Sequence, residues 1–428
     1  MRVALLIAGA ANMYCGSCLR DNRLAATLRR AGRDVVALPL YTPIRTDETA
    51  VTESRVYFGG VGVYVRQRWP LLAKLPGVAA LLNWGPALKM ASRLAGATRA
   101  EQLGPLTLSV LRGEQGEQRA ALRELVEGLR RLRPAVVNLP NLLFIGVAAE
   151  LRRALGVKVV CSLSGEDLFV DALPEPWRPR AMAEISRRSA DVDAYVAMTQ
   201  YYAGHAAAQF GLPRERIHHV PLGVAVEDFA PAATRDASRP FTLGYLARIC
   251  PEKGVGALID AFLRLRREGR RARLRIAGYL GASDRAYFDQ QLAKAAAAGA
   301  RDEIDVVGEV TREQKAAFLR SLDLFSVPSV YHESKGLYVI EAMAAGVPVV
   351  QPRHGSFPEL VESCVGGVLY EPNDPVALPS AIATLMDDAP RRAQLGAAGA
   401  AAVRAQYSDE IMARRMWQMY ETLPAPKA

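Results

Sequence analysis

The chain has 428 residues, of which 50% are hydrophobic, 23% charged and 7% aromatic. Because domains usually contain about 100–200 residues, we expect two or three, each with its own core. So much apolar material excludes disorder as the main state, and 34 glycines and 26 prolines exclude collagen-like and low-complexity proteins. The 54 Lys and Arg outnumber the 44 Asp and Glu, and the net charge of +10 favours an anionic partner: a nucleotide phosphate, a lipid surface or nucleic acid.

The cysteines indicate the compartment of the protein. There are five, at positions 15, 18, 161, 250 and 364, which is few and an odd number. They disfavour a disulfide scaffold and indicate a reducing compartment, so we expect a cytoplasmic protein. The apolar first residues could form a signal peptide, but an amphipathic helix pattern and another apolar segment follow them, so a buried first strand is expected instead. No apolar run reaches the roughly 18 residues of a membrane span.

Apolar segments of strand length alternate with segments of helical periodicity along most of the chain. The strands predicted before a proline-rich linker (residues 221–240) are Val3–Ile7, Val35–Leu38, Ala135–Asn138, Lys158–Cys161, Ala194–Ala197 and Ile217–Val220. Those predicted after it are Phe241–Leu246, Leu274–Ala277, Ile304–Val307, Leu322–Val327 and Val347–Val350. Strands that are apolar on both faces and separated by helices are typical of parallel sheets covered on both sides. The sequence therefore predicts an α/β fold with two doubly wound, Rossmann-like domains facing each other across a cleft.

The linker sets the predicted domain boundaries. The N-terminal domain comprises residues 1–225, and the C-terminal domain residues 226–405. Residues 406–428 contain a long amphipathic helix, Asp409–Thr422, which packs back on the first domain or caps the second; we expect the former.

A basic helical insertion is expected at about residues 66–133 of the first domain. Its first part, residues 66–100, has six basic residues, no acidic ones, and the two tryptophans Trp69 and Trp84. Such a segment fits a helix that lies in a lipid headgroup layer, as a peripheral membrane contact at the inner face of the membrane. The alternative, which we favour, is a helical insertion whose apolar face packs on the domain. No recognition module for nucleic acid is found, and nucleic acid is not an expected partner.

Two loops that follow predicted strands carry charged residues suited to a diphosphate. In the first, Arg248 and Lys253 follow the strand that ends at Leu246, and two fixed cations there suit a leaving diphosphate. In the second, a polar loop follows Val327 and a helix begins near Gly336. The first turn of a helix presents backbone N–H groups to a phosphate. Glu333 in the loop and Glu341 on the helix would stand on either side of that phosphate and accept hydrogen bonds from sugar hydroxyls. Solvated surface charges are the alternative for all four side chains.

These motifs resemble those of the retaining glycosyltransferases of family 4, which have the GT-B architecture of two Rossmann domains. The resemblance covers essentially the whole chain and is strongest from Gly244 to Glu371. It rests on a Glu-x7-Glu signature, here Glu333 and Glu341, continued by EAMAAGVPVV, and on an Arg…Lys-Gly pair, here Arg248, Lys253 and Gly254.

The resemblance implies a role for each matching residue. Arg248 and Lys253 hold the diphosphate of a nucleotide sugar, supported by the amides near Gly336 and Leu337. Glu341 binds the ribose, Glu333 the transferred sugar, and the backbone at Val307 and Gly308 the base. Gly16, in the turn after the first strand, approaches the donor phosphate or the acceptor. No cofactor or bound divalent metal is implied.

Two positions depart from the family pattern. Ser334 and Lys335 stand before Gly336 where members often have Gly-Phe, and Ser164-Gly165-Glu166-Asp167 stands where members often have a histidine near the reacting sugar. Glu166 or Asp167 is a candidate for a polar role towards the sugar. The alternative, which we favour, is a pair of acids that cap and stabilise the following helix.

Other cysteine, acidic and histidine motifs are not assigned to chemistry. Cys15 and Cys18 have the spacing of a redox motif, but no zinc ligands lie nearby in the sequence and the loop is expected to line the cleft. Asp191-Val192-Asp193 is interpreted as a turn before a strand, and His218-His219 and His332/His354 show no convincing metal-ligand spacing.

The sequence therefore predicts a retaining glycosyltransferase that moves a sugar from a nucleotide diphosphate sugar to a sugar, lipid-linked or polysaccharide acceptor. A phosphorylase or epimerase of the same fold is an alternative within the enzymes. A non-catalytic nucleotide-sugar-binding protein at a membrane surface is the alternative from another class.

Overall fold

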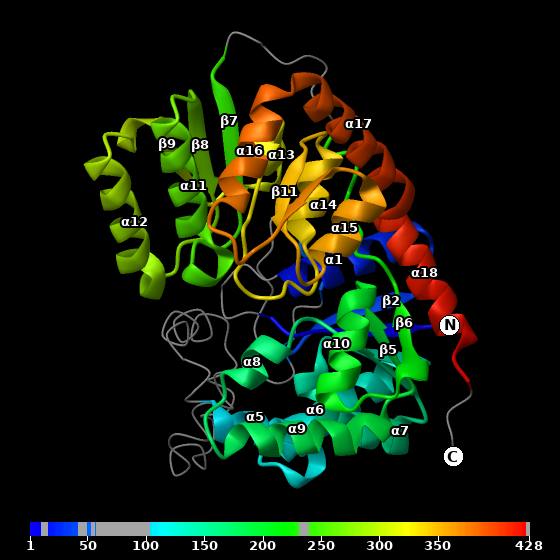
Figure 1. The fold of residues 1–428 in the computed structure, drawn as a ribbon. Coiled ribbons are helices and arrows are strands. Elements are labelled where there is room, and N and C mark those ends of the chain that lie inside the picture. Colours follow the sequence, from blue (N-terminus) through cyan, green and yellow to red (C-terminus); the bar gives the residue numbers. More distant parts are fainter. Residues whose placement is uncertain (10–15, 42–48, 53–55, 57–102, 231–238, 425–428) are drawn as a thin grey trace. The chain divides into compact units, whose positions relative to one another are not determined.

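The computed structural model describes residues 1–9, 16–41, 49–52, 56, 103–230 and 239–424 (Figure 1). The chain forms two compact units. Unit 1 consists of Met1–Pro221 and Met412–Ala428, and unit 2 consists of Leu222–Ile411. The sequence-based boundaries, after residues 225 and 405, lie within a few residues of these positions. The segment 66–100, for which membrane contact was considered, and Cys15 lie outside the described residues.

Unit 1 is built on a parallel six-stranded sheet with the order β2-β1-β3-β4-β5-β6. Its strands are β1 (Val3–Ile7), β2 (Val35–Pro39), β3 (Val136–Leu139), β4 (Lys158–Ser162), β5 (Ala194–Ala197) and β6 (Ile217–His219). Nearly every residue of β1 to β5 is buried, because helices cover the sheet, whereas the edge strand β6 is partly exposed. The strand order reverses between β1 and β3.

The helices of unit 1 supply the apolar faces that cover this sheet. They are α1 (Gly16–Arg30), α5 (Gly104–Leu111), α6 (Arg119–Leu132), α7 (Ala148–Leu155), α8 (Asp167–Asp171), α9 (Trp177–Arg188) and α10 (Gln200–Phe210). Short 3-10 helices lie between them: η3 (Gly113–Gln115), η4 (Leu142–Val147), η5 (Ser189–Asp191) and η6 (Arg214–Arg216). In α6, Leu122, Leu125 and Leu129 recur at helical spacing and are buried in the core.

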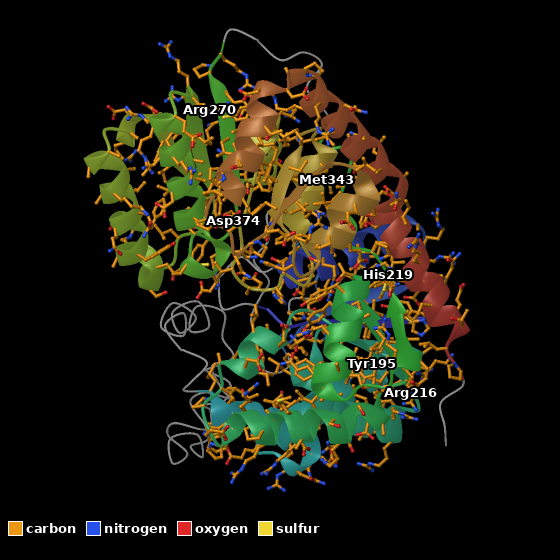
Figure 2. All side chains as sticks on the ribbon, in the orientation of Figure 1. Tyr195, Arg216, His219, Arg270, Met343 and Asp374 are labelled. Carbon is orange, nitrogen blue, oxygen red and sulfur yellow. The ribbon has the colours of Figure 1, made fainter. Side chains whose placement is uncertain are left out.

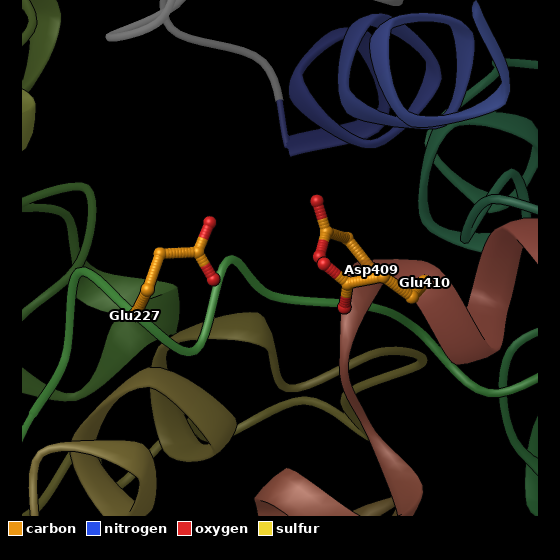
Figure 3. Close-up of side chains that lie close together, drawn as sticks. All are labelled: Glu227, Asp409 and Glu410. Carbon is orange, nitrogen blue, oxygen red and sulfur yellow. The ribbon is translucent and has the colours of Figure 1, made fainter. Parts of the chain in front are cut away.

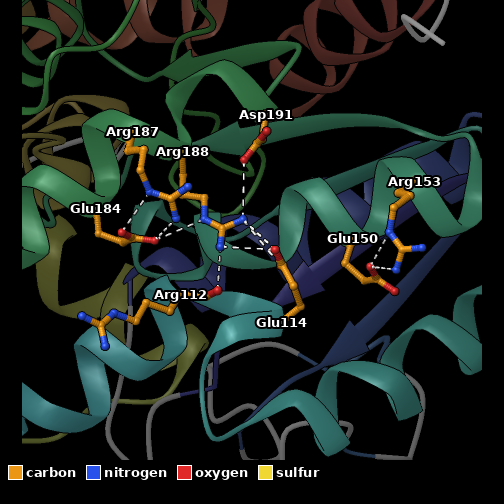
Figure 4. A network of polar contacts seen from close by, with 8 residues as sticks. All are labelled: Arg112, Glu114, Glu150, Arg153, Glu184, Arg187, Arg188 and Asp191. Atoms are coloured by element: carbon orange, nitrogen blue, oxygen red, sulfur yellow. Dashed lines mark hydrogen bonds and ion pairs between the residues drawn. The ribbon is translucent and has the colours of Figure 1, made fainter.

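A buried arginine ties the α5–η3 segment to α9 (Figure 4). Arg188 donates to the carbonyl oxygen of Arg112 at 2.6 Å, and its guanidinium lies within 3.4 Å of carboxylate oxygens of both Glu184 and Glu114. Because a buried arginine needs partners for its charge and its donors, this network fixes the end of α9 on the segment that leads into α6.

Unit 2 has a second parallel six-stranded sheet, with the order β12-β11-β10-β7-β8-β9. Its strands are β7 (Phe241–Leu246), β8 (Ala272–Ala277), β9 (Ile304–Gly308), β10 (Leu324–Phe325), β11 (Val349–Pro352) and β12 (Gly367–Tyr370). Counted from β7, this is the strand order of the Rossmann fold, and the order reverses between β7 and β10. The two sheets confirm the predicted α/β fold with two Rossmann-like domains.

Helices follow the strands of unit 2 in the same alternation. They are α11 (Val255–Arg267), α12 (Arg285–Ala297), α13 (Arg312–Arg320), α14 (Leu337–Ala344), α15 (Phe357–Cys364), α16 (Ala377–Asp387) and α17 (Ala389–Gln406), with the 3-10 helices η7 (Pro251–Lys253), η8 (Ala282–Asp284) and η9 (Arg301–Glu303). The last helix, α18 (Asp409–Thr422), begins in unit 2 and mostly belongs to unit 1, where the hydroxyl of Tyr420 donates to Asn138 of β3 at 3.2 Å.

Both units bury large side chains in their interiors. Tyr195 in unit 1 and Met343 in unit 2 are fully buried, whereas Asp374 is exposed (Figure 2). Within the described part of the chain, none of the helices combines the length and the apolar character that a bilayer crossing requires.

Candidate functional site

The reversal of strand order in unit 2 places two loops side by side. One loop follows β7 and contains Arg248 and Lys253, and the other follows β10 and contains Glu333. Since β7 and β10 are neighbouring parallel strands, both loops leave from the same edge of the sheet. A reversal point at the carboxyl ends of the strands is where doubly wound domains bind ligands.

The centre of this site is an ion pair between the two loops. Lys253 Nζ lies 2.5 Å from Glu333 Oε2, and both side chains are nearly buried, with exposed fractions of 13% and 7%. Burial alone would raise the pKa of Glu333, but the charge of Lys253 and hydrogen bonds from Lys253 and Tyr338 outweigh it and lower the pKa to about 2. Glu333 is therefore ionised at every physiological pH.

Two tyrosines, which the sequence analysis missed, complete the surroundings of this pair. The hydroxyls of Tyr331 and Tyr338 donate to Glu333 Oε2 at 3.2 and 2.9 Å. Lys253 Nζ lies 4.8 Å from the ring centroid of each tyrosine, within the range of cation–π attraction. Burial raises the pKa of both phenols, so they remain hydrogen-bond donors. Tyr331 precedes the Glu-x7-Glu signature by two residues and Tyr338 lies within it, and only the packed loop shows that both hydroxyls face Glu333.

Glycines allow the loops to approach each other closely. Gly254 has a φ of 74°, and a Cβ atom there would lie 1.9 Å from the carbonyl oxygen of Pro328. Gly355, with a φ of 59°, similarly packs its Cα against the backbone of Glu333. No other residue type fits such positions without a shift of the backbone. In the Lys-Gly motif, Gly254 therefore allows the close backbone contact with Pro328, and this contact brings the neighbouring Lys253 within reach of Glu333.

The helix α14 begins at this site. Its N-cap residue is Gly336, with a φ of 62°, and Leu337 is its first residue. The first turn of a helix directs backbone N–H groups and the positive end of the helix dipole outwards. Glu333 Oε1 accepts hydrogen bonds from the backbone N–H groups of Ser334 and Lys335 at 3.1 and 3.3 Å, which fixes the loop just before this helix.

Arg248 is the more accessible cation of the first loop. Its side chain is 54% exposed, its Nε donates to Cys250 Sγ at 3.3 Å, and its ion pair with Glu252 is long, at 3.9 Å. Its backbone is fixed, because the carbonyl oxygen accepts a hydrogen bond from Tyr245 at 2.8 Å. Arg248 can therefore reorient towards an anionic ligand at little cost.

Glu341 lies on α14 in a buried ion pair. Its Oε1 is 2.6 Å from Nζ of Lys315, on α13, and both side chains are nearly buried. Lys315 Nζ also lies 5.7 Å from the ring centroid of Phe229. Sequence reasoning missed Lys315, because nothing in its local pattern distinguishes it from a solvated lysine. The pair holds one oxygen of Glu341 in place beside the helix.

The predicted base-binding backbone lies at the end of β9. Val307 is exposed, and Gly308 has a φ of 79° with open space around its Cα. A cavity of about 340 Å³ opens beside Gly308 and is lined by Ile249, Gly278, Leu280, Arg285, Phe288, Asp289, Leu292, Arg301, Val306, Gly308 and Glu309. It lies at the carboxyl ends of β8 and β9.

The remaining predicted site residues belong to unit 1. Gly16 is the exposed first residue of α1. Glu166 is buried, and its carboxylate accepts hydrogen bonds from the backbone N–H groups of Leu142 and Ser164 and from the hydroxyl of Tyr202. As predicted for this pair of acids, Glu166 stands at the N-cap position of α8 and Asp167 in its first turn, but the side chain of Glu166 makes no capping hydrogen bond to α8 and instead joins the loops that follow β3 and β4. Asp167 is the first residue of α8 and also accepts a hydrogen bond from Tyr202, at 2.8 Å.

A group of carboxylates in unit 2 was not anticipated from the sequence. Oxygen atoms of Glu227, Asp409 and Glu410 lie within 4.8 Å of one another (Figure 3). Oxygen ligands at this spacing could hold a divalent cation. Because about 180 positions separate Glu227 from the other two, no local motif reveals the group. Metal independence of the chemistry at Glu333 remains a prediction.

The fold and the site define a class of protein with two Rossmann-like domains and with two cationic side chains, Arg248 and Lys253, at the strand-order reversal of the second domain. Comparisons with known proteins narrow this class. The sequence profile described as "Glycosyl transferases group 1" matches residues 227–402, and that of "Glycosyltransferase Family 4" matches residues 58–228. A D-inositol 3-phosphate glycosyltransferase from Segniliparus rotundus is 30% identical over 373 residues, which cover 80% of each chain. The chain belongs to the group 1 glycosyl transferases of family 4.

Other relatives agree with this assignment. A D-inositol 3-phosphate glycosyltransferase from Xylanimonas cellulosilytica is 34% identical over 262 residues, 58% of this chain and 61% of that protein. A GDP-mannose-dependent monoacylated alpha-(1-6)-phosphatidylinositol monomannoside mannosyltransferase from Corynebacterium glutamicum is 28% identical, over 65% of this chain and 74% of that protein. Among solved structures, sucrose-phosphate synthase from Thermosynechococcus elongatus is similar with a TM-score of 0.72 over 98% of both chains at 18% identity. That likeness shows the fold.

Proposed function

We propose that this protein is a retaining glycosyltransferase, which moves a sugar from a nucleotide diphosphate sugar to a sugar, lipid-linked or polysaccharide acceptor. The observation that carries the proposal is the buried pair of Lys253 and Glu333, 2.5 Å apart at the reversal point of unit 2. The accessible Arg248 and the start of α14 lie on the same two loops. The relatives support the proposal, because their names describe transfer from nucleotide sugars or to inositol-containing acceptors.

The residues of this site suit the departure of a diphosphate. Negative charge grows on the leaving diphosphate as its bond to the sugar breaks, and Arg248, Lys253 and the first turn of α14 are positive groups that stabilise it. Lys253 and the first turn of α14 are held in place before the substrate arrives and need little reorganisation during the reaction, whereas the exposed Arg248 turns towards the ligand.

Glu333 acts in this proposal as a charge and not as a proton donor. Its pKa of about 2 means that it carries no proton to deliver at neutral pH. Its negative charge can stabilise the positive charge that develops on the transferred sugar, and its hydrogen bond orients Lys253. Glu341, which Lys315 holds at 2.6 Å, is a buried carboxylate of the kind that accepts a hydrogen bond from a ribose hydroxyl.

A screen of nucleotide binding tests the proposal. Purified protein is heated with each common nucleoside diphosphate and nucleotide sugar, and the midpoint of thermal unfolding is recorded. A ligand at a hundredfold excess over its Kd adds about 2.7 kcal/mol to the free energy of unfolding. We expect one nucleotide to stabilise the native protein and to lose this effect in Arg248→Ala. A complete panel without stabilisation would contradict the proposal.

Turnover separates the enzyme from the alternative of a non-catalytic nucleotide-sugar-binding protein at a membrane surface. The relatives do not favour that alternative, because their names are those of transferases. Release of nucleoside diphosphate from the bound nucleotide sugar is expected of the enzyme. The anomeric configuration of the product, measured by NMR, tests retention.

A further inference from the structure

A histidine of unit 1 is held by an aspartate at the carboxyl edge of its sheet. Asp167 begins α8, which follows β4, and His205 lies on α10, which follows the neighbouring strand β5. His205 Nε2 lies 3.4 Å from Asp167 Oδ2. The carboxyl ends of neighbouring parallel strands therefore bring together two residues that are 38 positions apart in the sequence.

The imidazole ring is fixed by its surroundings. The ring of Tyr201 stacks on it with centroids 5.8 Å apart and an angle of 13°, and the ring of Tyr202 lies 5.9 Å away. Asp167 is itself fixed by a hydrogen bond of 2.8 Å from the hydroxyl of Tyr202. The position of His205 is thus determined from two helices before any ligand arrives.

The hydroxyl of Tyr202 is shared between two carboxylates. It lies 2.8 Å from Asp167 Oδ1 and 3.0 Å from Glu166 Oε2, although a phenol has one proton to donate. Glu166 has two backbone N–H groups as further partners. Asp167 has His205 as its second partner. The aspartate therefore favours an orientation of the imidazole in which an N–H group faces it.

His205 differs from a structural histidine in the exposure of its side chain. The side chain of His205 is 34% exposed, whereas that of Asp167 is 9% exposed. In a neutral imidazole, the second ring nitrogen is an acceptor when the first faces a carboxylate as a donor. A partly exposed, pre-oriented imidazole beside a buried carboxylate suits a hydroxyl group, which can both donate and accept a hydrogen bond.

We propose that Asp167 and His205 form an acceptor site in unit 1, in which the imidazole hydrogen-bonds a hydroxyl of a sugar or cyclitol and Asp167 positions the imidazole. This inference rests on the proposed glycosyl transfer, which requires an acceptor hydroxyl. His205 is the residue that contacts the ligand, and Asp167 is a positioning residue that acts through it.

Binding of polyols to the full-length protein tests the inference. The probes are myo-inositol, D-inositol 3-phosphate and methyl α-D-mannoside, and saturation-transfer NMR titrations give the Kd of each. We expect at least one probe to bind the native protein. His205→Ala should raise its Kd about tenfold, which corresponds to about 1.4 kcal/mol, the loss of one good hydrogen bond. Asp167→Asn should raise it by severalfold.

A double variant separates positioning from direct contact. If Asp167 acts through His205, adding Asp167→Asn to His205→Ala changes the Kd by less than twofold. The matched control is Gln209→Ala, one turn further along α10, where the amide contacts Asp171 and not Asp167. This control should bind the probe within twofold of the native protein. His205→Gln keeps a polar side chain and serves as a second variant of the same position.

The outcomes distinguish this inference from the proposed function. No binding of any probe to the native protein overturns the acceptor site, as does an unchanged Kd in both His205 variants. The thermal shift by the nucleotide must be the same in the native protein and in all these variants, because the nucleotide residues belong to unit 2. If no nucleotide raises the midpoint of thermal unfolding of the native protein, the proposed function is overturned instead.

Discussion

Replacement of Lys253 by methionine tests how the central ion pair is stabilised. Methionine keeps much of the length of the side chain but removes its charge. Glu333 then remains in a buried position without the cation 2.5 Å away. We expect Lys253→Met to unfold more easily than the native protein at pH 7, because an unpaired buried charge is strongly unfavourable.

The pKa of Glu333 gives the size of the effect. Its ordinary value of 4.5 falls to about 2 in the folded protein, and this difference corresponds to about 3 kcal/mol of stability at neutral pH. Because the folded-state pKa lies below the ordinary value, this stability is present above pH 4.5 and is lost as the pH falls towards 2. The deficit of Lys253→Met should therefore be about 3 kcal/mol at pH 7 and should shrink at pH 3, where the unpaired carboxyl takes up a proton.

Urea denaturation at both pH values measures these free energies of unfolding. The control is the double variant Lys253→Met/Glu333→Gln, which removes both charges. We expect it to recover about 2 kcal/mol relative to Lys253→Met at pH 7, since no buried charge is left unpaired. A deficit of the single variant that is the same at pH 7 and pH 3, or a double variant that recovers nothing, would refute this reasoning.

Three further predictions concern other parts of the chain. Arg248→Ala should change the free energy of unfolding by no more than about 0.5 kcal/mol from that of the native protein, because the side chain is exposed. It should raise the Kd of the stabilising nucleotide, measured by calorimetry, about 10- to 100-fold, because it removes a charged hydrogen-bond donor. A Kd equal to that of the native protein would exclude Arg248 from the site. Gly254→Ala should lower the free energy of unfolding, measured by urea denaturation, by about 2 kcal/mol more than Gly308→Ala does, since both positions have positive φ but a Cβ atom collides with backbone only at Gly254. Equal decreases would mean that the two loops move apart without strain. Trp69→Ala/Trp84→Ala should weaken retention on anionic vesicles in a sedimentation assay, and unchanged retention would remove the expectation of membrane contact.

Much of the fold could be predicted because hydrophobic patterning marks buried strands directly. Val3–Ile7, Ala194–Ala197 and Phe241–Leu246 are strands with the predicted bounds. The apolar run predicted at Leu322–Val327 is longer than β10, because apolar residues remain buried beyond the two that pair with β7. β12, Gly367–Tyr370, was missed because it is short and begins at the second residue of the pair Gly366-Gly367, which interrupts the apolar pattern.

Only those residues of the candidate site that belong to a local sequence motif could be predicted. The Lys-Gly and Glu-x7-Glu motifs identify Lys253 and Glu333, and the structure brings these two side chains into contact. The partner of Glu341 could not be found, because Lys315 lies on another helix and its pairing depends on how α13 packs against α14. Likewise, no sequence spacing relates His205 to Asp167, since their contact arises from the pairing of β4 with β5.

The most direct test of the central claim is turnover at the Lys253–Glu333 site. Release of nucleoside diphosphate is measured for the native full-length protein with the nucleotide sugar that stabilises it, and then for Glu333→Gln, whose thermal unfolding is followed in parallel. The account predicts release by the native protein and a loss of at least about tenfold in a Glu333→Gln protein that is still folded, because a charge facing the reacting sugar is worth 1.4 kcal/mol or more. Equal release by the folded variant would contradict the assignment of this site.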